Sequence, residues 1–341
     1  MAIDAGWTRR LGWGVVGCGW VARDYGVPGI VASGNGRVAG LFDPDPHSMA
    51  RLAATLPTDR GVAIPHDSLP SFLADPAVEA VYVATPNHAH AGIVAACAAA
   101  GKHVLCEKPM ATTLADARRM VEACDRAGVV YATAYDQRFH AAHVRLRDLV
   151  ADGTLGVVAQ ARIHYACWLP ADWAPDNWRV DPARAGGGAL IDLAPHGIDL
   201  LAMLLGDDWE SLIALTQTRV HGYAVDDGAV LAGRFSGGAL ATLHVAYNCP
   251  DSFPRRRLEL IGTRGMATAT NTMGQTPGGT LEWVDAETGR STAVPFGGAA
   301  DRGPFGEQAG AFADAVLSGR PYPFSPASDL AHHALLEAAC R

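Results

Sequence analysis

A glycine-rich turn directly after an apolar run constrains the fold of this chain more than any other feature. The run Trp13-Gly14-Val15-Val16 leads into Gly17-Cys18-Gly19-Trp20-Val21-Ala22, and a helical stretch follows. In this G-x-G-x-x-A pattern the first glycine permits a tight turn, and the second lets the backbone approach a pyrophosphate. The pattern predicts a dinucleotide site at the N-terminus of the following helix. Its loop residues are Gly17, Cys18, Gly19, Trp20 and Val21.

The first 133 residues alternate short apolar runs with helical stretches, which predicts a parallel sheet covered on both faces. The helical spacing is clearest from Leu114 to Ala127, where Thr113 and Asp116 can form a capping box. The apolar runs are 13–16, 38–42, 80–83, 103–106 and 129–132, and the other helical stretches include 49–56 and 89–100.

Asp43 follows the second apolar run and bears on the choice of dinucleotide. Its carboxylate can accept hydrogen bonds from the adenosine ribose hydroxyls and would repel a 2′-phosphate. In the alternative interpretation, Asp43 is only a turn residue in Asp43-Pro44-Asp45-Pro46. We predict NAD as the cofactor, in preference to NADP.

Composition and charge disfavour several other classes of protein. The net charge of −8 argues against a general nucleic-acid binder. Seven dispersed cysteines without a Cys-x-x-Cys pair indicate reduced thiols, with no metal site. No apolar run reaches the ~20 residues of a membrane span, and residues 1–10 are polar, without a secretory core. We expect a cytoplasmic protein with no membrane and no nucleic-acid partner.

Lysine is nearly absent from the chain. The 27 lysine and arginine residues include only two lysines, Lys102 and Lys108. Lysine supplies a compact ammonium whose pKa can shift, whereas arginine supplies a rigid fork that is always charged. Lys108 lies in Glu107-Lys108-Pro109, just after an apolar run. Two interpretations are open: Lys108 has a chemical role that requires a lysine, or it is an ordinary surface residue.

Four motifs, in this order, resemble the glucose-fructose oxidoreductase / inositol dehydrogenase / rhizopine-catabolism (Gfo/Idh/MocA) family over nearly the whole chain. They are the glycine-rich turn, Thr85-Pro86-Asn87-His88-Ala89-His90, Glu107-Lys108-Pro109, and residues 186–199, which read Gly-Gly-Gly-Ala-Leu-Ile-Asp-Leu-Ala-Pro-His-Gly-Ile-Asp. Gln137-Arg138-Phe139 and Trp178-Arg179-Val180-Asp181-Pro182 are also similar to the family.

The resemblance implies two domains. The first, residues 1–134, would be an α/β Rossmann domain that binds NAD. The second, residues 135–341, would be an α+β domain with a large, mostly antiparallel sheet that binds substrate and forms a homodimer or homotetramer. A C-terminal helix can pack on the first domain. Strand-like runs after residue 150 agree independently. They are 157–165, 211–219, 228–235, 240–247 and 257–261, and helical stretches follow at 305–317 and 328–339.

The resemblance also implies the chemistry, with Lys108, Asp192 and His196 as catalytic residues. Asp192 and His196 are spaced i, i+4 on one helix face, and Asp199 continues that stripe. His196 would be the general base and Lys108 would stabilise alkoxide character. In a second mechanism, Lys108 carries the proton and His196 only positions it. In a purely structural interpretation, Asp199 ties the helix to a neighbouring strand and His196 is a core histidine with its hydrogen bonds satisfied. Pro195, inside the helix, should kink it or remove one backbone bond.

Further site residues follow from the resemblance. Those predicted beside the cofactor are Thr85, Pro86, Asn87, His90, Glu107, Lys108 and Gln137. Those predicted to bind substrate are Lys108, Trp168, Trp173, Trp178, Arg179, Asp192 and His196, since tryptophan faces suit the C–H groups of a sugar. An acid-rich rim of Asp136, Asp226, Asp227 and Asp251 would suit an amino-sugar.

The predicted activity is NAD-dependent oxidation of a secondary hydroxyl of a sugar, a cyclitol or an aminoglycoside of antibiotic biosynthesis. The alternative within enzymes is reduction of a keto-sugar, possibly one linked to a nucleotide. The alternative outside enzymes is a cofactor-sensing regulatory protein.

Overall fold

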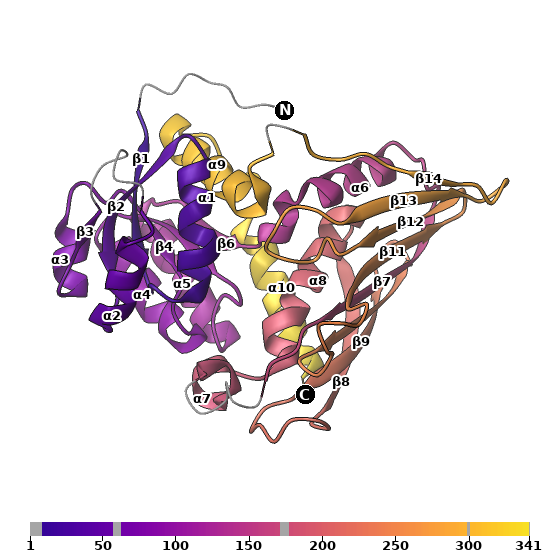
Figure 1. The fold of residues 1–341 in the computed structure, drawn as a ribbon, viewed down its shortest axis with the longest axis horizontal. Coiled ribbons are helices and arrows are strands. Elements are labelled where there is room, and N and C mark those ends of the chain that lie inside the picture. Colours follow the sequence, from indigo (N-terminus) through magenta and orange to yellow (C-terminus); the bar gives the residue numbers. More distant parts are fainter. Residues whose placement is uncertain (1–8, 57–62, 171–176, 299–300, 341) are drawn as a thin grey trace. The chain divides into compact units, whose positions relative to one another are not determined.

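The computed structural model describes residues 9–56, 63–170, 177–298 and 301–340, which form two compact units (Figure 1). The first unit consists of Met1–Asp136 and Arg302–Leu330, and the second of Gln137–Asp301 and Ala331–Arg341.

A six-stranded parallel sheet forms the centre of the first unit, in the order β3-β2-β1-β4-β5-β6. The strands are β1 (Leu11–Val16), β2 (Gly36–Phe42), β3 (Ile64–Pro65), β4 (Ala80–Val83), β5 (His103–Glu107) and β6 (Tyr131–Ala134). The helices are α1 (Val27–Ala32), α2 (Pro46–Ala53), α3 (Leu69–Ala74), α4 (His90–Ala99), α5 (Leu114–Ala127) and α9 (Gly303–Ser318). The alternation that predicted this sheet is confirmed.

Two apolar cores lie on opposite faces of the parallel sheet. On one face, Leu52 of α2, Ile30 of α1 and Phe312 of α9 pack with side chains of β1. On the other face, α3, α4 and α5 pack against β4 and β5. Helix α9 lies against α1 so closely that a Cβ at Gly29 would come within 2.7 Å of Phe305.

The second unit is built on an eight-stranded sheet in the order β14-β13-β12-β11-β7-β10-β9-β8, in which only β7 and β10 pair in parallel. The strands are β7 (Val158–Ala166), β8 (Trp209–Gln217), β9 (Gly228–Phe235), β10 (Leu240–Ala246), β11 (Arg256–Gly262), β12 (Gly265–Thr270), β13 (Thr280–Asp285) and β14 (Ser291–Ala293). The helices are α6 (Ala141–Ala151), α7 (Pro182–Ala185), α8 (Ala189–Leu205) and α10 (Pro326–Ala339), whose first residues belong to the first unit. The predicted fold class, with its mostly antiparallel second sheet, is confirmed.

Helix α8 packs on one face of this sheet. Its Leu193, Ile198 and Leu201 join a single buried core with Ile163 of β7 and Leu243 of β10. The opposite face exposes apolar side chains on neighbouring strands. They are Ile213, Leu215, Val230 and Leu240.

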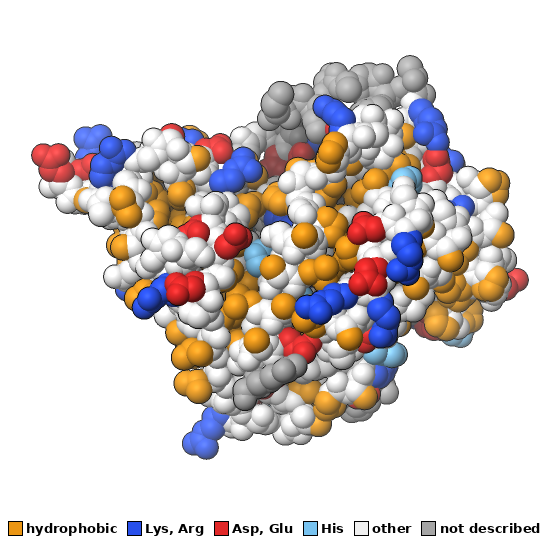
Figure 2. Space-filling view, turned by 180° about the vertical axis from the view of Figure 1, so that it is seen from behind, with side chains coloured by type: hydrophobic (Ala, Val, Ile, Leu, Met, Phe, Trp, Pro, Cys, Tyr) orange, Lys and Arg blue, Asp and Glu red, His pale blue; other side chains and the backbone are white. Residues whose placement is uncertain are grey.

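The stretch Pro182–Leu205 is the one part of the described chain that is long and apolar enough to cross a membrane by length and composition alone. Its most apolar window of 18 residues has a mean hydropathy of 1.5, and 72% of that window is buried inside the protein. Acidic and basic side chains are mixed over the face of the molecule drawn in Figure 2, without a field of one sign.

Candidate functional site

The glycine-rich turn after β1 has the backbone geometry that a dinucleotide requires. Gly17 has a φ of +88°, and a Cβ there would lie 2.6 Å from the carbonyl oxygen of Ala84. Only glycine fits that position. At Gly19 a Cβ would meet no atom within 4 Å, so its open side leaves room for a phosphate group. The turn therefore fits the pyrophosphate of NAD.

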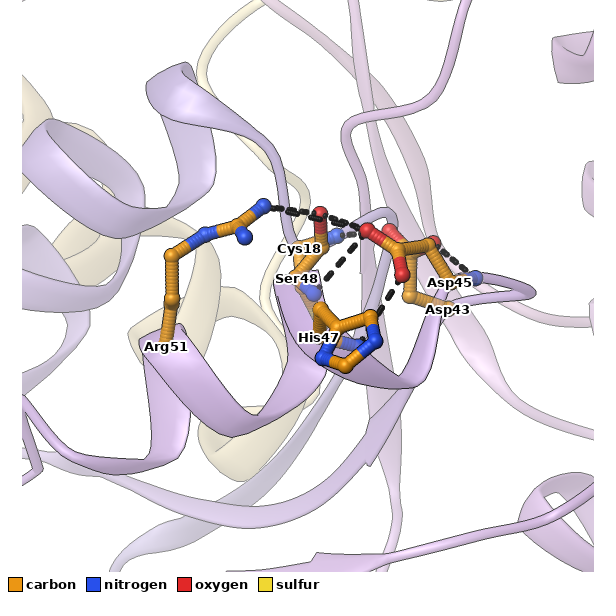
Figure 3. Close-up of polar contacts among 6 residues, drawn as sticks. All are labelled: Cys18, Asp43, Asp45, His47, Ser48 and Arg51. Carbon is orange, nitrogen blue, oxygen red and sulfur yellow. Dashed lines mark hydrogen bonds and ion pairs between the residues drawn. The ribbon is translucent and has the colours of Figure 1, made fainter.

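Asp43 lies beside this turn, at the end of β2 (Figure 3). One carboxylate oxygen accepts the Cys18 amide at 2.7 Å, and the other accepts the Asp45 amide at 2.8 Å. Each carboxylate oxygen can accept a second hydrogen bond, so these contacts leave capacity for ribose hydroxyls. Asp43 thus shapes the turn and still carries a charge next to it.

The remaining turn residues differ in accessibility. The Trp20 side chain is 41% exposed and meets Tyr25 edge-on, while Val21 is half-buried. Burial, followed by the charge of Asp43, raises the pKa of the Cys18 thiol to about 12. Cys18 therefore contributes its backbone to the turn and no reactive thiolate.

The loop after β4 and the turn after β5 are joined by His90. Its Nδ1 lies 3.0 Å from the Pro109 carbonyl oxygen, and its Nε2 lies 3.0 Å from that of Thr85. The Lys108–Pro109 peptide is cis, and the Lys108 side chain is partly exposed. Since the His90 imidazole is fully buried, it braces these two loops.

Two residues predicted beside the cofactor, His90 and Gln137, make contacts within their own chain, and their place beside the cofactor stays a prediction. Both ring nitrogens of His90 face backbone carbonyls, which leaves no accessible atom for a ligand. Gln137 is 1% exposed, and its Nε2 donates to the Gly274 carbonyl oxygen at 3.0 Å. Both side chains bind their own chain, because loop motifs also contain the residues that hold the loops.

The other residues predicted beside the cofactor stay predictions. Thr85 has a buried hydroxyl with no hydrogen-bond partner among the described residues. Pro86 is half-buried and Asn87 is 4% exposed. Glu107 ends β5 and accepts the Tyr82 hydroxyl at 2.5 Å.

In the second unit, helix α8 carries Asp192 and His196 and is held at its start by a distant residue. The Asp226 carboxylate accepts the amides of Gly188 and Leu190, each at 2.8 Å, and its carbonyl oxygen accepts the amide of Ala189. A Cβ at Gly188 would lie 2.0 Å from that carbonyl oxygen. Asp226 thus satisfies amides that a local N-cap would otherwise take.

A cluster of polar side chains surrounds Asp192. The Tyr247 hydroxyl donates to Asp192 Oδ2 at 2.8 Å, and Arg179 Nε lies 3.9 Å from the same oxygen. Burial, followed by the charge of Asp192, raises the pKa of Tyr247 well above its ordinary value, so the phenol remains a donor. His196 is 7% exposed and meets the Tyr165 ring edge-on, with centroids 5.7 Å apart.

Asp199, one turn further on, ties α8 to its surroundings, but to the turn Asp136–Phe139 and to α10, and not to a strand as in the alternative that we considered. Arg138 donates to both of its carboxylate oxygens, and His332 Nδ1 lies 3.4 Å away. Burial acts to raise the pKa of Asp199, but the charge and hydrogen bonds of Arg138 and the contact of His332 hold it below its ordinary value. Asp199 anchors α8, which remains continuous through Pro195.

The predicted aromatic site is only partly described. Trp168 is 39% exposed and packs edge-on against His221. The Arg179 guanidinium lies 4.5 Å from the centre of a Trp178 ring. Trp173 lies outside the described residues. The structure thus brings Arg179 to Asp192 and Trp178 to Arg179, whereas Trp168 packs with His221.

The acid-rich rim does not form as expected. Asp227 is fully buried, where one oxygen accepts the amides of Arg219, Val220 and His221, and Asp226 caps α8. Asp136 is 4% exposed. Asp226 and Asp227 satisfy amides of their own chain, and Asp251 is exposed but paired with Arg255. The number of acids in the sequence therefore overstates the acidity of this rim. Within the described ranges, no three histidine, cysteine or acidic side chains cluster to hold a metal.

Sequence reasoning missed Tyr247 and assigned Asp226 to an acid-rich rim, whereas these two residues contact α8, the helix of the predicted base. Neither belongs to a motif, and they lie 55 and 38 residues after the groups that they contact. Strand β10 runs into Tyr247 and the Asp226-Asp227 pair precedes β9, so strand ends facing α8 were the available signal.

The turn built for a dinucleotide and the helix with a carboxylate and an imidazole define a nicotinamide-dependent oxidoreductase. The chain belongs to the Gfo/Idh/MocA family. Residues 11–135 match the oxidoreductase family with an NAD-binding Rossmann fold, and residues 143–268 match the GFO/IDH/MocA C-terminal domain. The predicted family, enzyme class and cofactor, NAD, are confirmed.

Similar proteins support this assignment along the chain. The 1,5-anhydro-D-fructose reductase of Ensifer adhaerens is 37% identical over 276 residues, 81% of this chain and 80% of that one. The structure of aldose-aldose oxidoreductase from Caulobacter crescentus complexed with glycerol has a TM-score of 0.86 and 27% identity, covering 98% of this chain and 97% of that one. GenD2 from gentamicin A biosynthesis, in complex with NAD, has a TM-score of 0.80 and 30% identity, covering 98% and 94%.

Proposed function

We propose that this enzyme oxidises a secondary hydroxyl of a sugar-type substrate to a ketone, with NAD as the hydride acceptor. The observation that supports this most strongly is the cluster on α8, where the Tyr247 hydroxyl holds Asp192 one turn before a buried imidazole. Two of the relatives above are named for reactions of sugars.

The proposed mechanism assigns a task to each side chain. Lys108, Asp192 and His196 are the catalytic residues. His196 takes the hydroxyl proton as general base, because an imidazole can exchange a proton near neutrality. Lys108 donates a hydrogen bond to the same oxygen as negative charge develops there. Asp192, oriented by Tyr247, accepts a substrate hydroxyl. NAD, when bound, accepts the hydride.

The residues proposed for binding follow from the same assignment. Gly17, Gly19 and Asp43 hold the dinucleotide, with Thr85, Pro86, Asn87 and Glu107 in the neighbouring loops. Trp178 and Arg179 contribute to the substrate site, as do Trp168 and Trp173. The first unit is thereby the cofactor domain, and the second unit is the substrate domain.

Two variants of this function have a specific observation in their favour. The relative that is 37% identical is named a reductase, which favours reduction of a keto-sugar. The likeness to GenD2 favours an aminoglycoside of an antibiotic pathway. The aminoglycoside alternative is weakened because Asp226 and Asp227 bind amides of their own chain and are not available to substrate ammonium groups.

A substrate panel tests the proposal directly. The NAD-loaded enzyme is supplied in turn with neutral sugars, cyclitols, acidic sugars and aminoglycosides, and NADH formation is followed by absorbance. Keto-sugars with NADH test the reverse direction. We expect turnover with at least one sugar-type class. Binding of NAD without turnover of any class in either direction would refute the proposal.

We also propose a cytoplasmic homodimer or homotetramer. All seven cysteines are free thiols, and four are buried, as suits a reducing compartment. The apolar side chains on the open face of the second sheet, with Leu215 74% and Ile213 66% exposed, suit contact with another copy. Light scattering of the purified protein measures its mass; a monomer at micromolar concentration would contradict the oligomer.

A further inference from the structure

Arg256 begins β11 on the face of the sheet that packs against α8. Its Cα partner on β7 is Tyr165, and its guanidinium carbon lies 5.9 Å from the centre of the Tyr165 ring. The next residues on the same side, Leu258 and Leu260, belong to the core that α8 covers. Since Tyr165 contacts His196, Arg256 belongs to the surroundings of the proposed base.

The charge of Arg256 is not balanced by a neighbour that the structure describes. Its Nε is buried without a hydrogen-bond partner, and no described carboxylate forms an ion pair with it. The nearby charged groups are engaged elsewhere, Arg255 with Asp251 and Asp192 with Arg179. A buried donor without an acceptor costs free energy, and the cost is larger for a charged group.

The guanidinium of Arg256 packs against a glycine and occupies the space that a side chain would take there. A Cβ at Gly274 would lie 2.3 Å from Arg256 Nη1, so any larger residue would displace the arginine. Gly274 also accepts the Gln137 amide through its carbonyl oxygen, which holds this backbone in place. The chain therefore accommodates a bulky cation at this position.

The pKa of the Cys167 thiol is influenced by several charged side chains in the same region. Burial, followed by Asp192, raises the pKa of Cys167 to about 12, while Arg256, Arg255 and Arg179 act to lower it. Three guanidinium groups and one carboxylate thus influence one side chain. The region around Asp192 is more cationic than the count of acids in the whole sequence suggests.

We infer that Arg256 binds an anionic group of the substrate, a carboxylate or a phosphate, and that the substrate is an acidic sugar. This inference rests on the oxidation proposed above and names its substrate class. Arg256 as a whole is partly exposed, and its two terminal nitrogens are not among the buried unpartnered atoms, so they can form two parallel hydrogen bonds with such a group. An ammonium group of an amino-sugar would instead be repelled by the same cation.

The neighbouring arginine provides a matched control. Arg257 points to the opposite face of the sheet, where it is 54% exposed and paired with Glu259. The NAD-loaded full chain and its Arg256→Gln, Arg256→Lys and Arg257→Gln variants are compared. The probes are D-glucose, D-glucuronate, D-glucose 6-phosphate and D-glucosamine. Calorimetry measures binding and NADH absorbance measures kcat/KM.

We expect the parent enzyme to prefer an acidic probe. Arg256→Gln should weaken its binding roughly tenfold to a hundredfold, as for a lost charge-assisted hydrogen bond, and should leave D-glucose nearly unaffected. Arg256→Lys keeps the charge and should lose less. Arg257→Gln should change either value by about twofold at most. The acidic probe should also lose affinity as salt is raised.

The outcomes separate this inference from the function on which it rests. If an acidic probe binds through Arg256 but no sugar reduces NAD, the anion site stands and the oxidation fails. If neutral sugars are oxidised while neither acidic probe binds better than D-glucose, the anion site is wrong and the oxidation stands. Equal losses for neutral and acidic probes in Arg256→Gln, or a preference for D-glucosamine, would likewise overturn the anion site.

Discussion

The glycine-rich turn after β1 and the start of α8 both place glycines before a helix, but for different physical reasons. Gly17 is needed for its positive φ, a property of the backbone at that residue. Gly188 has a negative φ and is needed because Asp226 approaches within 2.0 Å of where its Cβ would be. The first requirement is local, whereas the second depends on a residue far along the chain.

This difference extends to the side chains that do the chemistry. The turn is stabilised by Asp43, which follows the next strand in the chain and accepts the Cys18 amide. The helix is completed by Asp226, Tyr247 and Arg138, which come from three separate parts of the second unit. The glycine-rich motif therefore predicts both the turn and Asp43, which stabilises it. The motif at α8 predicts the reactive residues of the helix but not the distant side chains that hold them.

The largest expected effect tests the helix. His196→Asn keeps a polar side chain of similar reach but removes the base. We expect kcat to fall roughly 10²–10⁴-fold. The rise of kcat/KM with pH near neutrality, which an imidazole base produces, should disappear. Steady-state kinetics between pH 5 and 9 (roughly two units either side of neutrality) measure both.

The pH profile distinguishes the two proton carriers that we considered. If the limb near neutrality survives in His196→Asn, then Lys108 or another group carries the proton and His196 only positions it. Thermal unfolding of the full chain serves as the control for folding, because His196 belongs to the second unit whereas the turn that holds the cofactor belongs to the first.

Lys108→Arg tests the turn after β5 and should have the next largest effect. Charge is kept, but the planar fork displaces the donor from the substrate oxygen, so we expect kcat to fall about 10²–10³-fold. NAD affinity should be unchanged. The matched control is Lys102→Arg, because the Lys102 ammonium only donates to the carbonyls of Asp75 and Val78. Similar activity in both variants would remove Lys108 from the mechanism.

Tyr247→Phe tests the partner that no motif contains. It removes one hydrogen bond to a carboxylate, which is worth about 1.5–3 kcal/mol, so kcat/KM should fall roughly tenfold to a hundredfold. We expect kcat to fall and KM to change less, because Asp192 is still present but is no longer held in its orientation.

The matched control for this variant is Tyr223→Phe, which also removes a phenol contact, to the Leu169 carbonyl oxygen. Thermal unfolding of both variants reports any shared structural cost. An equal loss of activity in the two variants would show that Tyr247 supports the fold alone.

Much of the fold was predictable, and the failures have physical causes. The bounds predicted for α5, β4 and β9 agree with the structure to the residue. Strand β12 was missed because Gly265–Thr270 consists mostly of small residues and lacks the large apolar side chains that mark a strand. Strands β13 and β14 were also missed, although Leu281 and Trp283 alternate in β13. These strands lie towards one edge of the sheet, where pairing with β11 supplies what local propensity does not.

The candidate site was predictable where local spacing determines it. Asp192 and His196 share a helix face because an i, i+4 spacing places them there. The roles of Asp226, Asp227 and His90 were not predictable, because each side chain satisfies backbone groups that become buried only when distant segments pack. A sequence shows which residues carry charge, but the buried backbone decides which of those charges remain for a ligand.

The smallest expected effect concerns Asp43, for which the turn and ribose roles coexist. Asp43→Asn keeps one oxygen acceptor for the turn and loses the charge that would repel a 2′-phosphate. We expect the preference for NAD over NADP to fall by about tenfold, as for exchanging a charged for a neutral hydrogen bond. Asp45→Asn, which changes the residue that caps α2 through the amides of His47 and Ser48, is the control and should keep the preference. Fluorescence titration of both cofactors gives the ratio, and thermal unfolding gives the cost to the turn. If Asp43→Asn lowers stability while the ratio stays constant, the carboxylate serves the Cys18 and Asp45 amides alone, and the preference for NAD must come from elsewhere in the first unit.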